Sequence, residues 1–215
     1  MEEVLPGLFG LLVMGAFVAF FVWLIRFSMR AEAERQRIWA TFAAQNGLTF
    51  SPPSGPWYNK RAATIHGTAE GVSCTLDTYV VSTGKSATSY TRLRAMALQP
   101  MPLDARVYRE TVFGAIGDLL GAQDVTVGDE AFDKACVVKA NREDLVRQWL
   151  HQPLRSAYMH FSFSFENRGG ALVYRQGQIE LVWLAAERDP RVLHAAVSVA
   201  VEAARFRGVQ QGAFR

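Results

Sequence analysis

The sequence predicts an α+β protein, with one N-terminal transmembrane helix followed by a single domain of mainly antiparallel strands with packed helices. An apolar run without a charged residue opens the chain, and strand-like segments then follow in groups with helical patterns between the groups. Grouped strands are typical of α+β folds and argue against a doubly wound parallel sheet. The expected divisions are a transmembrane anchor over 1–30, a juxtamembrane helix over 31–46, a cytoplasmic domain over 47–208 and a tail over 209–215.

The apolar run from Val4 to Ile25 has the length of a membrane-spanning helix. Its 22 residues would extend about 33 Å as an α-helix, close to the thickness of a hydrocarbon core. A cleavable signal peptide would instead have basic residues before the run and a small-residue cleavage site after it. Glu2 and Glu3 precede the run, and residues 27–30 contain no such site. We therefore expect an uncleaved anchor.

Charged residues that follow the span predict its orientation. Arginines lie only on the C-terminal side, at Arg26, Arg30, Arg35 and Arg37. Because basic residues near the end of a span are retained in the cytoplasm, we expect a single-pass protein of the inner (cytoplasmic) membrane with its N-terminus outside. Trp23, Arg26 and Arg30 are the expected membrane-surface anchors, where the indole meets the interface and the guanidinium groups meet anionic headgroups.

Small residues within the span predict an interface with another membrane helix. Gly15 and Ala19 are four residues apart, so they share one side of a helix and permit close approach of a partner helix. The alternative interpretation is that these small residues reflect the ordinary composition of membrane helices, in which glycine is common. The span has no His, Cys, Asp, Glu, Lys or Arg, which argues against haem ligation and against an ion or proton pathway within it.

The first helix is expected to continue beyond the membrane. Residues 30–37 are good helix formers, and Trp39, Phe42 and Ala43 recur at helical spacing. Asn46-Gly47 supplies a C-terminal stop. The resulting helix of about 40 residues would place its Trp39/Phe42 stripe against the domain.

Alternation and turn residues predict the elements of the domain. Val72–Ser82 alternates apolar and polar side chains along its length, as a half-buried strand does. The other expected elements are strands at 62–68, 87–98 and 105–111, a short helix at 112–120, and strands at 125–127 and 135–140. A helix capped by Asn141, a strand containing Phe161, Phe163 and Phe165, a hairpin of 171–174 and 179–184, and a final helix from Asp189 to Gly208 should follow. The three phenylalanines, Val72, Leu76 and the helix of Leu193 are expected to supply the core.

No motif in the sequence predicts catalysis. Thr83-Gly84-Lys85-Ser86 resembles the end of a phosphate-binding loop, but Tyr79 stands where that motif requires its first glycine, and a hairpin turn is expected there. The acidic residues Asp118, Asp124, Asp129, Glu130 and Asp133 lack the spacing of a calcium loop, and we interpret them as solvated turn and cap residues. We expect no catalytic residue.

The potential metal ligands and thiols are scattered through the chain. His66, His151, His160 and His194 have no paired ligand at metal-binding spacing, so we expect no metal and no other cofactor. Cys74 and Cys136 have no nearby cysteine partner, and in a cytoplasmic domain they are expected to be buried and reduced. The formal net charge of +3 comes partly from the juxtamembrane arginines and makes no case for nucleic acid.

One segment of the domain resembles part of a known group of sequences. Gly128-Asp-x-x-Phe132-Asp133 precedes an expected strand, the Asn141 helix and Leu150-His-Gln-Pro-Leu154. The arrangement is similar to uncharacterised bacterial single-pass membrane proteins that carry a small membrane-adjacent α+β domain, and it covers residues 105–205. The resemblance implies no activity. Taken on its own residues, Gly128-Asp129 should turn the chain and Phe132 should anchor it in the core.

The sequence favours a non-catalytic, membrane-anchored accessory or scaffold subunit of a larger integral-membrane complex, with a respiratory or photosynthetic complex as a candidate host. Its partners would be membrane lipid and integral-membrane proteins. Two alternatives remain open. One is a membrane-tethered adaptor or assembly factor that engages its partners transiently. The other is a tethered enzyme or ligand sensor whose site residues are scattered and unrecognised.

Overall fold

The computed structural model describes residues 4–56, 61–82, 84, 86–109, 123–165 and 170–206, with side chains from residue 13 onward. The chain divides into two compact units, Met1–Ile38 and Trp39–Arg215. The helices are α1 (Val4–Gln45), α2 (Glu130–Ala135), α3 (Glu143–Trp149), α4 (Gln152–Phe163) and α5 (Pro190–Arg205). The strands are β1 (Thr49–Ser51), β2 (Thr64–Ala69), β3 (Val72–Ser82), β4 (Ala87–Met96), β5 (Asp104–Tyr108), β6 (Gln123–Asp124), β7 (Val137–Ala140), β8 (Gly170–Arg175) and β9 (Gln178–Leu184).

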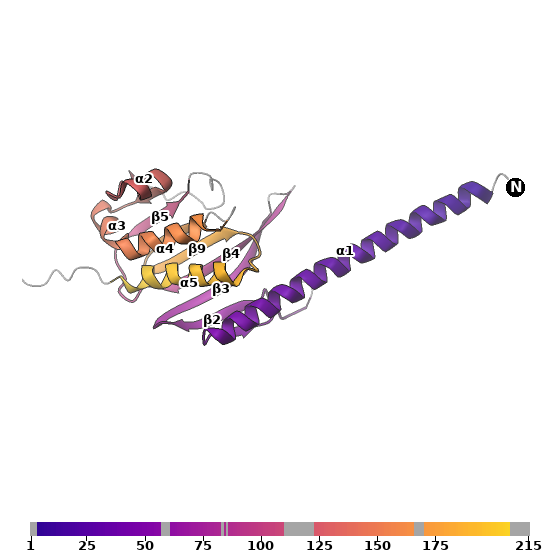
Figure 1. The fold of residues 1–215 in the computed structure, drawn as a ribbon, viewed down its shortest axis with the longest axis horizontal. Coiled ribbons are helices and arrows are strands. Elements are labelled where there is room, and N and C mark those ends of the chain that lie inside the picture. Colours follow the sequence, from indigo (N-terminus) through magenta and orange to yellow (C-terminus); the bar gives the residue numbers. More distant parts are fainter. Residues whose placement is uncertain are drawn as a thin grey trace, which may run out of the picture. The chain divides into compact units, whose positions relative to one another are not determined.

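The first helix is continuous, as the sequence predicts. α1 runs for 42 residues (Figure 1). It ends where Gly47 adopts a φ of 65°, a left-handed conformation that glycine reaches without steric cost. The Leu48 N–H then donates to the Ala43 carbonyl at 2.8 Å, which satisfies a carbonyl that the helix itself leaves unpaired. The predicted stop at Asn46-Gly47 is confirmed.

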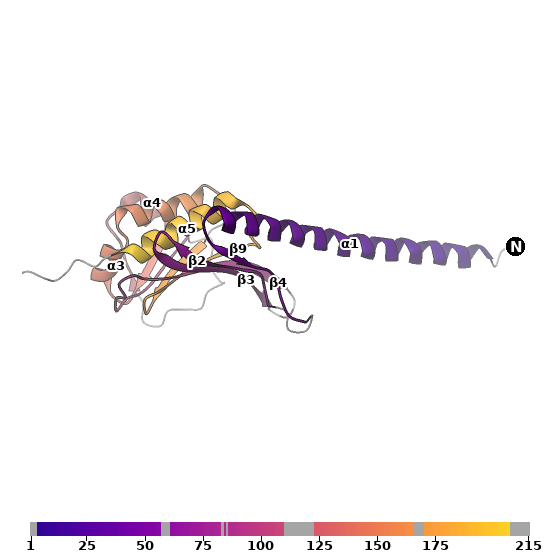
Figure 2. The ribbon, with the colours of Figure 1, turned by 90° about the horizontal axis from the view of Figure 1, so that it is seen from below.

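The described strands form one antiparallel sheet in the order β1-β2-β3-β4-β9-β8-β5-β7-β6. Helices α4 and α5 lie on the same side of this sheet (Figure 2). The α+β fold class predicted from the sequence is therefore confirmed. The predicted meander appears as β2–β3–β4, and the predicted hairpin around Gln176-Gly177 appears as β8–β9.

The hydrophobic core lies between the sheet and the helices that cover it. Strands contribute one alternating set of side chains, including Val72, Leu76, Leu93 and Trp183. Helix α5 contributes a long apolar stripe that includes Leu193, Ala196 and Ala200. The predicted start of α5 is confirmed, because the Asp189 carboxylate accepts a hydrogen bond from the Arg191 N–H at 2.9 Å and Pro190 occupies the first turn. Gly208, its predicted end, lies outside the described residues.

The predicted strand at Phe161, Phe163 and Phe165 is wrong. Residues 152–163 form α4, which begins at His151-Gln152-Pro153. Leu154, Tyr158 and Phe161 are fully buried and recur at helical spacing, so burying this stripe overrides the short Phe-Ser alternation. Only Phe161 of the three enters the core, since Phe163 is 42% exposed and Phe165 is half-buried.

Several local predictions around residues 120–150 need correction. Asn141 does not cap α3: its side-chain oxygen accepts from the Asp104 N–H at 2.9 Å, and Arg142 occupies the N-cap without a side-chain bond. The predicted strand at 125–127 does not form, and the preceding Gln123–Asp124 pairs with β7 instead. Gly128 does turn the chain, with a φ of 83°, and Phe132 is buried within the short helix α2. The predicted helix at 112–120 lies outside the described residues.

Candidate functional site

The N-terminal unit exposes an apolar surface that it does not use in folding. Residues 13–45 lie in a helix long and apolar enough to cross a membrane, and none of its most apolar window is buried in the structure. Phe17 is 65% exposed and Trp23 is 57% exposed. A contiguous apolar surface of this kind marks a contact with lipid or with another protein. A core helix of a soluble protein would instead have been buried.

The predicted small face on this helix is open. A Cβ atom added at Gly15 would meet no heavy atom within 4 Å, and Ala19 is exposed one turn further on. A larger side chain at either position would therefore clash with nothing in the described protein. Any effect of added bulk at Gly15 would report on a partner outside this chain.

The predicted membrane-surface anchors follow the small face. Trp23 stacks between Phe20 and Phe27, with ring centroids 6.0 Å and 5.6 Å away. Arg26 and Arg30 are both exposed and lie three and seven residues beyond the tryptophan, on the same side of the helix. This order of aromatic and basic side chains is typical of a helix leaving the hydrocarbon for the headgroup region. The assignment of the three residues as anchors stays a prediction.

Further along the N-terminal unit, an ion pair neutralises one acidic side chain, Glu32. The Arg35 guanidinium donates to the Glu32 carboxylate at 2.6 Å, and the Gln36 amide donates to it at 3.1 Å. Glu32 is therefore neutralised locally by its own neighbours on the helix.

In the domain, one buried residue, Glu187, holds together segments that are far apart in the sequence. Glu187 is fully buried. Its carboxylate accepts from the Trp183 indole N–H at 3.0 Å and from the backbone N–H groups of Arg188 and Asp189 at 2.8 Å. Its backbone carbonyl accepts from the Trp39 indole N–H at 3.0 Å. The network fixes the domain's portion of α1 to β9 and to the start of α5.

Thr91 extends this network to β4. Its hydroxyl donates to the Ala185 carbonyl at 2.6 Å and accepts from the Glu187 N–H at 3.0 Å. Ala185 has a φ of 120°, a strained conformation for a residue with a Cβ. Every polar group named here serves the fold, so we assign the network a structural role. No sequence pattern predicted this hydrogen-bond network. The Glu187-Arg-Asp-Pro190 run before the last helix is the feature that could have indicated a capped, buried turn.

The sheet face opposite α4 and α5, which we call the outer face, is polar at its centre. Asp77 accepts from Arg92 at 3.0 and 2.8 Å and from Arg94 at 2.8 Å. The hydrogen bond to Asp77 raises the pKa of Arg92. A shallow hollow of about 170 Å³ lies beside Arg94, lined also by Ser73, Thr75, Ala95, Met96 and Gln178. One terminal nitrogen of Arg94 is paired with Asp77, whereas its buried Nε–H has no hydrogen-bond partner in the structure.

The thiols and histidines do not assemble into a reactive centre. Both cysteines are buried and free, which confirms that part of the prediction, and burial raises the pKa of Cys136 to about 12. Such thiols stay protonated and unreactive at neutral pH. The described parts of the chain contain no group of three His, Cys, Asp or Glu side chains able to hold a metal ion.

The acidic residues of the predicted turn act as caps, as the sequence suggests. Asp129 accepts from the Phe132 N–H at 3.2 Å and from the Arg155 guanidinium at 3.0 Å. The bond from Phe132 and the contact with Arg155 lower the pKa of Asp129. Asp133 accepts from the N–H groups of Val127 and Gly128 at 2.8 and 3.0 Å. Asp118 lies outside the described residues.

The fold and the apolar helix define a class: an α+β protein with one N-terminal helix able to cross a membrane. Among solved structures, the chain is similar to the crystal structure of the mycobacterial trehalose monomycolate transport factor A, TtfA. The likeness covers 78% of this chain and 91% of that chain, with a TM-score of 0.52 and 8% sequence identity. At this identity it shows a shared fold. No family model matches the sequence, and no curated protein matches it.

Proposed function

We propose that this protein is a membrane-anchored accessory factor that binds an integral-membrane partner. The exposed apolar surface of α1 carries this proposal, because the described fold leaves that surface without a covering. Lipid can cover most of such a helix, and close packing of small side chains provides a route to a protein partner. We place the N-terminus outside and the domain in the cytoplasm of a bacterium, since the arginines follow the span.

The host complex proposed here is a transport assembly. A transport factor has the same fold as this chain over 91% of its own length, and that likeness favours transport over the respiratory or photosynthetic host that the sequence left open. The protein of that structure acts, by its name, in the transport of trehalose monomycolate. An equivalent role here would be to support a membrane transporter rather than to carry out a reaction.

A binding role for the domain is supported by the use of its polar groups. The carboxylate of Glu187 is engaged by three N–H donors, and Asp77 is engaged by two arginines. General acid–base catalysis requires a titratable group in reach of a substrate, and these two carboxylates are occupied by the fold. We therefore infer a non-catalytic role.

The experiment that tests this proposal adds bulk to the small face of α1. We expect Gly15→Leu to reach the membrane at normal levels but to lose its partner in a pull-down from detergent-solubilised membranes. Gly10→Leu is the matched control, because it makes the same change about 140° around the helix. A Cβ added at position 15 meets no other heavy atom within 4 Å, so the domain should remain folded in Gly15→Leu.

If Gly15→Leu and Gly10→Leu both co-purify with the same proteins at wild-type yield, the small face is incidental. Binding would then have to reside in the domain. A second measurement tests the topology: alkaline phosphatase fused after Arg215 should be inactive, since that enzyme matures only outside the cytoplasm. High phosphatase activity would overturn the proposed orientation.

A further inference from the structure

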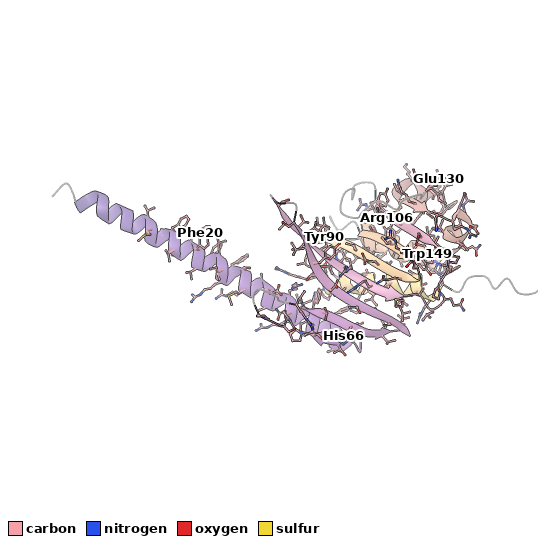
Figure 3. The ribbon with its side chains drawn as sticks, turned by 180° about the vertical axis from the view of Figure 1, so that it is seen from behind. Phe20, His66, Tyr90, Arg106, Glu130 and Trp149 are labelled. Atoms are coloured by element: carbon pink, nitrogen blue, oxygen red, sulfur yellow. The ribbon has the colours of Figure 1, made fainter. Side chains whose placement is uncertain are left out.

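The β3–β4 hairpin extends past its neighbouring strands at its turn end. β2 pairs with β3 only from Val72 to Leu76, and β9 pairs with β4 only from Tyr90 onward. The pairing of β3 with β4 nevertheless continues to Ser82 and Ala87. We call residues 79–82 and 87–90 the hairpin tip (Figure 3, near the labelled Tyr90). Tyr90 still pairs with Leu184, and the Ser89 carbonyl still accepts from the Ala185 N–H at 3.1 Å. Beyond them, the described part of the tip is a ribbon of two strands.

Apolar side chains are exposed on both faces of the hairpin tip. Tyr79 and Tyr90 stack on the outer face with ring centroids 5.5 Å apart, and Leu184, opposite Tyr90 on β9, is 46% exposed. Val80 points to the other face and is 61% exposed. Exposed apolar surface of this kind marks a contact with a membrane or with another protein.

The charges around the tip suit the surface of an anionic bilayer. Residues 78–91 contain no acidic side chain, and Asp77 at the base is neutralised by two arginines. The Arg92 guanidinium lies 5.0 Å from the centre of the Tyr79 ring. Glu180 faces the same area from β9, opposite Arg94. Tyrosine is enriched at membrane interfaces because its ring is apolar and its hydroxyl is wet.

A short length of chain separates the apolar run from the domain. Ile25 ends the apolar run, and Trp39 begins the second unit. The 13 residues between them extend about 20 Å as a helix. A domain tethered this closely has its surface within reach of the headgroup layer. An apolar tip on such a domain meets lipid at a very high local concentration.

We propose that the hairpin tip docks into the interfacial region of the bilayer that α1 spans. The proposal rests on the membrane anchor of the proposed function. Val80, Val81 and the Tyr79–Tyr90 pair enter the interface, and Arg92 stays at the headgroup level. The domain then has two points of attachment to the membrane, α1 and the hairpin tip, which restrict the ways in which it can present its outer face to a partner.

The test places a fluorescent probe on the tip of the full-length protein. Val80→Cys is labelled with the environment-sensitive dye NBD and reconstituted into vesicles of phosphatidylcholine and phosphatidylglycerol, with nitroxide-labelled lipid as quencher. Ser73→Cys is the matched control, because it is exposed on the same strand about 23 Å along it. The native thiols are buried. Wild-type protein treated with the same dye measures any residual labelling of these two thiols.

We expect blue-shifted NBD emission at Val80→Cys that the nitroxide lipid quenches, and water-like, unquenched emission at Ser73→Cys. Adding Val81→Glu to the labelled protein should reduce the quenching, because a carboxylate opposes insertion beside anionic lipid. Absence of quenching at Val80→Cys overturns the proposal. A blue shift without quenching also overturns it, since the tip would then be covered by protein.

Extraction with alkaline carbonate separates this inference from the proposed anchor. A protein that resists extraction but shows no quenching at Val80→Cys retains its anchor and has no docked tip. A protein that carbonate releases from the vesicles lacks the anchor itself, and both proposals then fail. Labelled Val80→Cys must also keep the near-ultraviolet circular dichroism of the wild type, which confirms that the hairpin and core are intact.

Discussion

The two units of this protein use the same residue types in opposite environments. In the N-terminal unit Phe17 and Trp23 are more than half exposed, whereas Trp149 and Trp183 of the domain are buried to within 1%. The domain removes its large side chains from water by packing them against each other. The N-terminal helix offers its apolar side chains to its surroundings. The difference matches a helix able to cross a membrane and a domain that folds around its own core.

The polar groups of the two units differ in the same way. A helix satisfies its backbone N–H and C=O groups internally, which lets a single segment enter a bilayer. The domain satisfies many of its polar groups through contacts between distant segments, as the indole N–H bonds of Trp39 and Trp149 show. The helix therefore needs no other segment to satisfy its backbone polar groups in lipid, while the polar groups of the domain depend on its tertiary contacts.

The largest expected effect comes from deleting a buried tryptophan. Trp149 is fully buried, packs edge-on against Tyr174 at 5.3 Å and donates to the Ala203 carbonyl. Trp149→Ala should lower the free energy of unfolding of the domain by about 3–5 kcal/mol, through lost burial and an unfilled cavity. Trp23→Ala should leave it unchanged. Urea titration of both variants in detergent checks this contrast, and an equal loss in both would break the comparison.

The second effect concerns the buried carboxylate of Glu187. Glu187→Ala leaves the Trp183 indole and the N–H groups of Arg188 and Asp189 without their acceptor. We expect a loss of about 2–3 kcal/mol in the free energy of unfolding, because buried donors without partners are costly. Glu187→Gln should lose less, since one amide oxygen still accepts. The same titration measures both, and a fully stable Glu187→Ala would show that the network is dispensable.

The third effect is the loss of the cap on α5. Asp189→Ala removes the carboxylate that accepts from the Arg191 N–H and should cost about 1 kcal/mol. Asp189→Asn should restore most of that loss, because asparagine is an equally good capping residue. Thermal unfolding followed by circular dichroism measures both variants. Equal melting temperatures for the alanine and asparagine variants would show that the cap hydrogen bond contributes nothing.

The smallest effect is a pH dependence at Asp129. The Phe132 N–H and the Arg155 guanidinium lower the pKa of this carboxyl in the folded protein. Stability from the carboxylate is therefore present above its unfolded pKa and is lost as the pH falls through the folded pKa. Asp129→Asn keeps a cap but loses the charge, so its stability should fall below wild type at pH 7, and the difference should shrink as the pH falls from about 4 through the lower folded pKa. Denaturation midpoints measured against pH test this, and parallel curves would contradict it.

Elements that depend on local sequence were predictable. α1 and α5 carry their own signals, an apolar run with a glycine stop and an Asp-Pro start before an apolar stripe. The β8–β9 hairpin likewise has its turn between two apolar runs. In each case neighbouring residues along the chain fix the conformation, so a single sequence is sufficient to read it.

Elements decided by distant contacts were not predictable. Phe161 belongs to a helix because its partner lies across the core, where its ring stands 5.4 Å from that of Trp183. Asn141 bonds to Asp104, which is 37 positions away, in preference to the helix that follows it. Local alternation and capping preferences are worth about 1 kcal/mol, which the burial of one large side chain exceeds.

The sequence by itself determined where the apolar helix lies and which residues form its small face, because both follow from hydrophobicity and a helical repeat. Only the tertiary structure revealed the Glu187 network and the exposed hairpin tip. Glu187 is bonded by groups up to 148 positions away, and Val80 is exposed because the neighbouring strands end before it. Neither the network nor the exposure of Val80 can be predicted from one short segment of the sequence. Each arises from how the strands are ordered and where each one ends, and pairing over long sequence separations decides that order.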